Sequence, residues 1–288
     1  MIRTTVIAAS LAIAFSTAQA AQPLTVKVYN ADGNSFNVNS TLVYGEKDAM
    51  VIDAGFTRAD ALRIAANVLD SGKQLTTIYV SQADPDYYFG VETLTEFFPQ
   101  ADVVTTPAVL AKLTAKMSGK LAFWGPKMGA NAPRKPAVPR ALEGNTLMLE
   151  GQTIEIRGTQ GLLAHRPYAW IPSIKTIAGN IGVFGNMHVW TADSQTAAER
   201  AAWVAQLDEM LALKPELVIP GHMKAGTTLD ASAISFTKDY LLAFEKNLAA
   251  SKNSVELINA MKQSYPQVTD GAMSLDIGAK VNKGEMKW

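Results

Sequence analysis

The chain alternates short apolar runs with longer segments in which apolar residues recur at helical spacing. Residues 24–28 alternate apolar and polar side chains, which predicts a half-buried strand. The runs 39–44 and 49–53 flank the turn-like sequence Gly-Glu-Lys-Asp, which predicts a hairpin. Thr57 and Asp60 have the spacing of a capping box and predict a helix after the hairpin.

A strand, a polar loop and a helix are expected next. Residues 75–80 form an apolar, β-branched run, the loop 81–90 follows, and 91–98 has a helical pattern. A short strand is expected at 101–105 and a helix over about 107–116. Because α/β folds collect their functional groups at the carboxyl ends of strands, the loop 81–90 is expected to form the floor of a pocket.

The pattern then breaks into a proline-rich stretch over residues 117–140. We expect a long irregular connection here, inserted into the domain. Connections of this length in compact domains usually form lids or rims of binding sites. Trp124 therefore either lines the rim of the pocket or packs on the plain surface.

The second half of the chain repeats the alternation of strands and helices. Its clearest helix spans 196–213, with a capping box and a buried apolar stripe. The residues after 263 are expected to be loosely held. The other expected elements are strands at 146–149, 153–157, 169–171 and 176–178 and helices at 230–250 and 254–263. Two groups of strands, each interleaved with helices, predict an α/β fold, an αββα sandwich of two mixed β-sheets with outer helices.

The N-terminal segment has the form of a secretory signal. Arg3 precedes an apolar run over 6–15, and Ala18-Gln19-Ala20 has the small-x-small form of a cleavage site. We therefore expect a signal peptide over residues 1–20 and a single domain over 21–288. The mature protein is expected to be periplasmic or secreted. It should have no membrane anchor after cleavage, because no later segment approaches about 18 uninterrupted apolar residues.

The composition narrows the chemistry. Lysine plus arginine and aspartate plus glutamate each total 26, and nothing in their distribution indicates a nucleic acid or an anionic membrane as partner. The chain has no cysteine, which excludes disulfides and thiolate metal ligands. It also lacks the Gly-x-Ser-x-Gly elbow of serine hydrolases and the glycine-rich loops of nucleotide sites. The expected partner is a small-molecule substrate or ligand, and the oligomeric state is left open.

The polar loop carries the most specific motif in the chain, Ser81-Gln-Ala-Asp-Pro-Asp-Tyr87. It resembles the metal-binding signature His-x-His-x-Asp-His of the metallo-β-lactamase fold superfamily in spacing and context. In that alignment Gln82 and Asp84 stand at the first two histidines, Asp86 matches the aspartate, and Tyr87 replaces the last histidine. One of the four ligand types is kept, so the chain resembles a known fold with a degenerate site.

Other segments resemble motifs of the same family in the same order. Asp53-Ala-Gly55 resembles its Asp-x-Gly turn and Pro172-Ser-Ile-Lys175 a strand turn. Ile177-Ala-Gly-Asn180 resembles the segment that usually ends in a metal-bridging aspartate, and Pro220-Gly-His222 the last ligand motif. His165 lies near the place where a further zinc histidine is expected. The resemblance implies a hydrolase in which two zinc ions activate a water against an ester, lactone, thioester or amide carbonyl.

The altered positions change the metal chemistry that this resemblance implies. Zinc favours nitrogen and sulfur donors, whereas Gln82 and Asn180 offer a neutral carbonyl oxygen and a tyrosine ligates poorly unless it is deprotonated. A binuclear zinc site is therefore not expected. The oxygen-rich set of Asp84, Asp86 and His222 is the candidate site for one divalent metal ion of open identity.

Each candidate side chain also has a structural interpretation. Asp86 either binds metal and orients a water, or accepts loop amides in an Asx-type turn. Tyr87 and His188 are candidate catalytic donors to a developing oxyanion, yet Tyr87 also fits a buried wall aromatic and His188 a cap of the next turn. His222 either binds metal or hydrogen-bonds backbone carbonyls, and Asp84 either binds metal or simply lines the pocket.

Two functions stay open at this point. The first is an exported hydrolase of an ester, lactone or related carbonyl substrate with an oxygen-rich mono-metal site. The second is a non-catalytic relative that binds a small molecule or a protein partner in the same pocket, where neutral polar groups suit hydrogen bonding. For both, Gln82, Asn180, His165 and Trp124 are the expected pocket residues.

Overall fold

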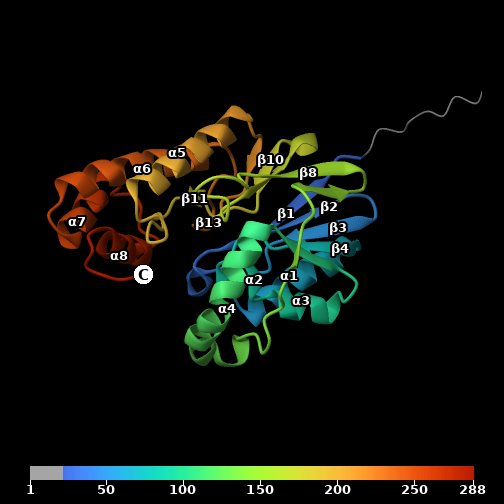
Figure 1. Cartoon of the computed structure of the whole chain (residues 1–288). Helices are drawn as coiled ribbons and strands as arrows, with labels where there is room; N and C mark the ends of the chain where they lie inside the picture. The colour runs from blue at the N-terminus through green and yellow to red at the C-terminus, as the bar shows by residue number, and fades with distance from the viewer. Residues whose placement is uncertain (1–21) are drawn as a thin grey trace, which may run out of the picture.

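Two β-sheets lie face to face, and helices cover the outer face of each (Figure 1). The structure is a computed structural model that describes residues 22–288. The signal peptide predicted over residues 1–20 lies outside the described residues. The predicted αββα sandwich is confirmed, because both sheets combine parallel and antiparallel strands and both carry helices on the outside.

The first sheet follows chain order from one edge to the other. Its strands are β1 (Thr25–Asn30), β2 (Asn39–Tyr44), β3 (Asp48–Ile52), β4 (Gln74–Tyr79), β5 (Asp102–Thr105) and β6 (Arg140–Ala141). The antiparallel pairing of β2 with β3 confirms the predicted hairpin, and β3 to β6 pair in parallel. The parallel pairing brings the carboxyl ends of β3 and β4 to the same edge of the sheet.

The second sheet is built from the second half of the chain. Its strands are β7 (Thr146–Leu149), β8 (Gln152–Arg157), β9 (Tyr168–Ile171), β10 (Thr176–Ala178) and β12 (Leu217–Val218). They lie in the order β12-β10-β9-β8-β7, with only β10 and β12 in parallel. A separate parallel pair, β11 (Phe184–Gly185) and β13 (His222–Met223), sets Phe184 opposite His222.

The core between the sheets follows from the apolar pattern of the strands. In β3, Met50 and Ile52 belong to the core between the two sheets, whereas Ala49 and Val51 pack against the helices outside. Successive strand side chains point to opposite faces, so an uninterrupted apolar run marks a strand that is buried on both sides. The first sheet is therefore a middle layer of the molecule, as the sandwich requires.

The helices divide into two groups, one for each sheet. The first group is α1 (Arg58–Ser71), α2 (Pro85–Tyr88), α3 (Val91–Phe97) and α4 (Pro107–Met128). The second group is α5 (Ala197–Ala212), α6 (Ser232–Ala250), α7 (Ser254–Ser264) and α8 (Ala272–Asn282). Both predicted capping boxes, Thr57 with Asp60 and Thr196 with Glu199, are present. Within residues 22–288, none of the helices has the length and apolar character needed to cross a membrane.

Helix α4 differs from the prediction. It continues to Met128, so the prediction that the helix ends near Lys116 and that all of 117–140 is an irregular connection is wrong. The face that packs against the first-sheet core comprises Leu113, Met117, Leu121, Trp124 and Met128. Pro126 lies in the last turn, where its missing N–H removes a single hydrogen bond, and the packing of this apolar face outweighs that loss.

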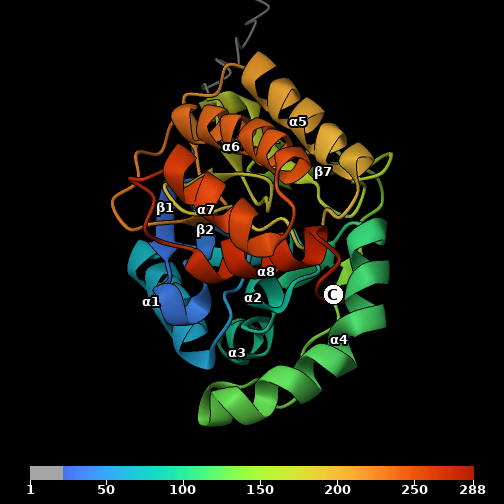
Figure 2. The same cartoon turned by 90° about the vertical axis from the view of Figure 1, so that its left-hand side faces the viewer.

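The C-terminal residues also differ from the prediction that they are loosely held. Leu275 and Ala279 of α8 belong to the core of the second helical layer. Arg200 of α5 donates a hydrogen bond to Asn282 at 2.6 Å, which ties the end of α8 to the layer. Figure 2 shows α8 crossing below α6 and α7, with the C-terminus beside α4. The apolar stripe of α8 is too short to predict an ordered helix from the sequence. Packing against α7 stabilises the helix.

Candidate functional site

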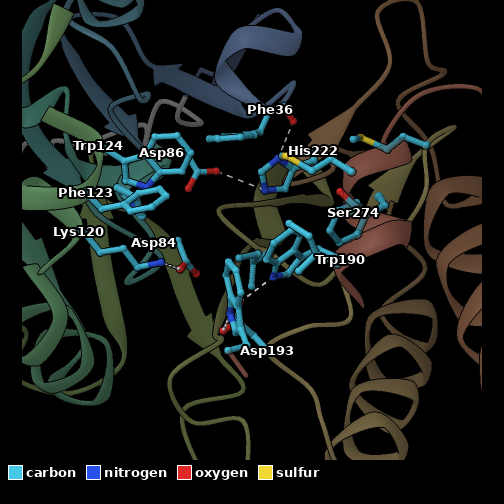
Figure 3. Close-up of a pocket in the computed structure, with 17 residues that line it drawn as sticks. Phe36, Asp84, Asp86, Lys120, Phe123, Trp124, Trp190, Asp193, His222 and Ser274 are labelled. Atoms are coloured by element: carbon cyan, nitrogen blue, oxygen red, sulfur yellow. Dashed lines mark hydrogen bonds and ion pairs between the residues drawn. The ribbon is translucent and has the colours of Figure 1, made fainter. Parts of the chain in front are cut away.

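A cavity of about 420 Å³ lies between side chains of the first and second halves of the chain (Figure 3). Its aromatic lining consists of Phe36, Phe123, Trp124, Phe184, Trp190 and Trp288. Its polar lining consists of Asp84, Asp86, Lys120, Asp193, His222 and Ser274. Mostly apolar walls with a few inward polar groups are typical of small-molecule sites of about 300–1,000 Å³.

The polar loop places Asp84 and Asp86 in the cavity through a short helix. Asp84 is the residue before α2, Pro85 starts that helix, and the amide of Tyr87 donates to the Asp84 carbonyl at 3.0 Å. A proline is well placed at the first helical position, because its fixed φ suits the helix and no N–H is needed there. The turn directs Asp84 and Asp86 into the cavity and leaves the ring of Tyr87 in the interior.

His222 reaches the cavity because Gly221 allows a close approach of two loops. A Cβ at position 221 would lie 2.1 Å from the carbonyl oxygen of Asn180, so only glycine fits there. The His222 ring stacks on Phe184, with centroids 5.3 Å apart, and its Nδ1 lies 3.0 Å from the carbonyl oxygen of Phe36. This leaves Nε2 of His222 facing Oδ2 of Asp86 at 3.5 Å.

The hydrogen bonding of His222 shows which of its two ring nitrogens carries the proton. A carbonyl oxygen only accepts, so Nδ1 donates to Phe36 and Nε2 of the neutral ring is an acceptor that faces Asp86. Burial raises the pKa of Asp86 well above its usual range, and the nearby charge of Asp84 adds to this. Burial also lowers the pKa of His222 to about 4. His222 therefore presents an acceptor nitrogen, and no proton, to the Asp86 carboxyl group.

The other two carboxylates at the cavity have cationic or N–H partners. Asp84 lies 3.9 Å from the ammonium of Lys120, and burial together with the charge of Asp193 raises the pKa of Asp84. Asp193 accepts hydrogen bonds from the indole N–H groups of Trp190 at 2.7 Å and Trp288 at 3.1 Å. Burial acts to raise the pKa of Asp193, but nearby cationic side chains and these N–H groups outweigh it and lower the pKa. Ionised Asp193 thus holds two walls of the cavity in place.

Gln82 and Asn180 do not line the cavity, so their prediction as pocket residues is wrong. The side-chain amide of Gln82 donates to the carbonyl of Pro167 at 2.8 Å. The amide of Asn180 donates to the Ile219 carbonyl at 2.9 Å, and its oxygen accepts from the Val183 amide at 2.9 Å. Both side chains are buried, and these hydrogen bonds supply the partners that buried polar groups require.

Tyr87 and His188 lie outside the cavity as well. The Tyr87 hydroxyl donates to the backbone carbonyl of Asn180 at 3.1 Å and is fully buried, so it cannot reach a ligand. His188 is 1% exposed, and its Nδ1 lies 2.9 Å from the hydroxyl of Tyr240 in α6. His188 lies between the cavity residues Met187 and Trp190 in sequence. Its position is nevertheless set by packing against the second helical layer. The positions of Tyr87 and His188 therefore give no support to the predicted role as catalytic donors.

His165 and Trp124 were both expected in the pocket, and the structure separates them. His165 does not line the cavity; it lies partly buried beside Lys112 and Arg166, and burial lowers its pKa to about 4. Trp124 does line the cavity and packs edge-on against Phe36, with centroids 5.5 Å apart.

Sequence reasoning missed several lining residues. Lys120 stands three residues before Phe123 and four before Trp124, which is helical spacing, but the glycine and proline that follow favoured a loop. Trp190 and Asp193 are close in sequence and joined by a hydrogen bond, yet nothing in their pattern indicates a site. Trp288 lies far along the chain, so only tertiary structure places it at the cavity.

The residues present do not fit a metal centre. Across residues 22–288, no three His, Asp or Glu side chains come close enough to hold an ion. Asp86 and His222 face each other, but Asp84 is directed toward Lys120, so the three predicted ligands do not form one group (Figure 3). Catalytic zinc sites use three protein ligands, and two donors fall short of that. The other family positions, Gln82 and Asn180, do not line the cavity, and the side-chain oxygen of Asn180 already accepts a hydrogen bond from the Val183 amide.

The chain resembles known metallo-β-lactamases in three dimensions. A metallo-β-lactamase family protein from Thermus thermophilus is 15% identical with a TM-score of 0.60, covering 91% of this chain and 92% of its own. A metallo-β-lactamase from Pontibacter korlensis is 16% identical with a TM-score of 0.53, covering 78% of this chain and 97% of its own. The DIM-1 metallo-β-lactamase exposed to ceftazidime is 16% identical with a TM-score of 0.54, covering 81% and 96%. Identities this low establish the fold alone.

A family assignment comes from the sequence itself. Residues 33–167 match the description of the metallo-β-lactamase superfamily, a range that includes Asp53-Ala-Gly55 and the loop 81–90. No curated protein sequence matches the chain significantly. The protein therefore has the metallo-β-lactamase fold, which is hydrolase-like, and its residues 33–167 match the metallo-β-lactamase superfamily.

Proposed function

We propose that the protein binds a small, largely apolar molecule in the cavity, with Asp86 and His222 as its polar anchor. The observation that carries this proposal is the reassignment of the family's metal positions. Gln82, Tyr87 and Asn180 are all used in internal hydrogen bonds, while aromatic side chains take over the lining. Such a cavity offers shape, apolar surface and one polar pair, which are the features of a ligand site.

The walls of the cavity support binding because contacts within the protein already hold them. Asp193 accepts hydrogen bonds from Trp190 and Trp288, and the rings of these two tryptophans pack edge-on with centroids 5.0 Å apart. Trp124 packs edge-on against Phe123 at 4.9 Å. Groups that are ordered before binding lose less conformational entropy when a ligand arrives, so this arrangement favours affinity.

A second candidate function is hydrolysis of an ester, lactone or related carbonyl compound. Its support is the hydrolase-like fold together with Asp86 and His222, which lie side by side in the cavity at positions that resemble family ligands. A mono-metal version of this chemistry would need donors beyond these two side chains, and the described residues do not supply them.

We further propose that the protein acts outside the cytoplasm. Support comes from the charged, apolar and small-x-small pattern of residues 1–20. N-terminal sequencing of the protein purified from its native host should begin near Ala21. An intact N-terminal methionine on protein recovered from the cytoplasmic fraction would contradict this.

The binding proposal is tested with a fragment library. Ligands that bind the folded protein raise its melting temperature, and hits are then measured by isothermal titration calorimetry. Binding should be saturable with one site per chain, and the substitution Trp124→Ala should weaken it. Phe97→Ala, which removes an exposed aromatic of α3 outside the cavity, is the matched control and should leave affinity unchanged.

Two results would overturn the proposal. One is the absence of any saturable hit, and the other is a set of hits whose affinity is insensitive to Trp124→Ala. Turnover of esters or lactones that added zinc or manganese supports and a chelator abolishes would favour the second candidate function instead.

A further inference from the structure

We propose that the molecule held in this cavity carries a protonated amine, and that its ammonium group binds against Asp86 among the aromatic rings of the wall. This inference rests on the proposed function, because it names the chemical class of the ligand for the same cavity. Two observations support it: Asp86 forms no ion pair with a lysine or arginine of the described residues, and aromatic rings line the cavity.

Asp86 is a buried carboxyl group without a cationic partner. It is 6% exposed, and among residues 22–288 no lysine or arginine forms an ion pair with it. Its side-chain partner is His222, whose Nδ1 proton is committed to the Phe36 carbonyl. The negative charge of Asp84 acts on Asp86 as well. An unpaired buried carboxylate is costly, and a cation that enters beside it compensates its charge directly.

The other two carboxylates at the cavity, Asp84 and Asp193, have cationic side chains near them. Lys120 is the nearest cation to Asp84, at 3.9 Å. Lys112 and Arg166 lie close enough to act on both Asp84 and Asp193, although neither of these two cations lines the cavity. Asp84 and Asp193 thus each have cationic neighbours within the protein. Asp86, on the His222 side, is the acidic group that is left for a ligand.

The aromatic walls suit an ammonium group. A cation within about 6 Å of a ring centroid is attracted by the negative face of the ring, most strongly for tryptophan. Two lysines of α4 already use this attraction, since Lys127 lies 3.5 Å from the centroid of Phe123 and Lys120 lies 5.8 Å from that of Trp288. Phe36, Trp124 and Phe184 also line the cavity, so an amine can meet both the carboxyl group and several rings.

A ligand of the opposite charge fits less well. An anion that reaches the His222 side would meet Asp86 and the negative faces of the rings, and Nδ1 of His222 has no free proton to offer. A neutral alcohol can hydrogen-bond to the pair, but it gains no charge compensation. We therefore expect affinity to be highest for an amine, lower for an alcohol and lowest for a carboxylate.

The experiment compares three probes that share one apolar ring system: tryptamine, tryptophol and indole acetate. Their affinities for the full-length mature protein are measured by isothermal titration calorimetry at neutral pH and low salt, up to millimolar probe. Tryptamine should bind at least about tenfold more tightly than tryptophol, because hydrogen bonds to charged groups are stronger than neutral ones. Indole acetate should bind most weakly.

Asp86→Asn keeps the size of the side chain and removes its ability to ionise beside an ammonium group. It should reduce tryptamine affinity by about tenfold and leave tryptophol affinity unchanged. Asp102→Asn is the matched control: Asp102 is exposed, pairs with Arg140 and does not line the cavity. It should change neither affinity. Should Asp86→Asn fail to fold, the ratio of the tryptamine and tryptophol affinities of the unaltered protein still tests whether the cavity prefers an amine.

The outcomes separate the ligand class from the proposed function. If tryptophol binds as tightly as tryptamine, or indole acetate binds most tightly, the ligand class is wrong and binding in the cavity stands. The ligand class is also wrong if Asp86→Asn weakens all probes equally. Binding of none of the three probes would overturn both proposals.

Discussion

Replacement of Asp53 by asparagine should change how the stability of the protein depends on pH. Asp53 directly follows β3, is 2% exposed and has a left-handed backbone with φ of 67°. Its carboxyl oxygens accept hydrogen bonds from the amide and the hydroxyl of Ser81, each at 2.7 Å. Burial raises the pKa of Asp53 to about 8, although both hydrogen bonds act to lower it. Asparagine has the same shape, tolerates positive φ and does not titrate.

The pKa values of Asp53 in the folded and the unfolded chain determine how much the free energy of unfolding changes with pH, and in which direction. In the unfolded chain an aspartate titrates near 3.9, so between about pH 4 and pH 8 only the folded state keeps the proton. A folded-state pKa that is raised adds stability below pH 4, and that stability is lost as the pH rises toward 8. Each pH unit in this window corresponds to about 1.4 kcal/mol, so the unaltered protein should lose about 2.5 kcal/mol relative to Asp53→Asn between pH 5 and pH 7.

Urea unfolding, followed by far-UV circular dichroism at pH 5, 6 and 7, measures this difference. Other titrating groups are common to both proteins and cancel when one free energy of unfolding is subtracted from the other. Asp102→Asn, at an exposed ion pair with Arg140, is the control and should show a small difference that does not change in this way. A difference between the unaltered protein and Asp53→Asn that stays constant from pH 5 to pH 7 would refute the reasoning.

Three further outcomes are expected. Gly221→Ala should lower the free energy of unfolding by about 2–3 kcal/mol in urea titrations, because its Cβ would lie 2.1 Å from the Asn180 oxygen; an unchanged midpoint would contradict this. Trp288→Ala should weaken cavity ligands about threefold to tenfold by calorimetry, since it removes the ring that packs against Trp190, while the melting temperature stays nearly constant because Trp288 is 51% exposed. Equilibration with zinc followed by desalting should leave well below one zinc per chain by elemental analysis, and a stoichiometric, chelator-sensitive ion would show that the donor set was misjudged.

The altered family positions have a common structural consequence. In the superfamily that this chain resembles, metal ions join the loops at the mouth of the sandwich. Here hydrogen bonds join the same loops: Gln82 to Pro167, Tyr87 to Asn180, and Asn180 to Ile219. Each of these bonds is buried, so each is protected from competing water. The fold can therefore keep the geometry of the mouth without metal ligands.

Local patterns were enough to predict most of the secondary structure. The hairpin of β2 and β3, the strand β4 and the helix α5 were predicted because strand alternation and capping boxes are encoded by residues close in sequence. The error in α4 arose where Pro126 and the glycines suggested a loop. Contacts of Trp124 and its neighbours with the first-sheet core compensate for them, and those contacts are not visible in the local sequence.

Local patterns in the sequence predict the layered α/β fold and the presence of Asp84, Asp86 and His222 near one edge of the sheets, and residues 33–167 match the metallo-β-lactamase superfamily. Contacts between distant parts of the chain set which polar side chains face the cavity. Rotation about a few loop dihedrals turns a side chain either into the cavity or into a buried hydrogen bond, and the choice depends on partners that are distant in sequence. Asp86 and His222 turned inward, whereas Gln82 and Asn180 found carbonyl partners in the interior.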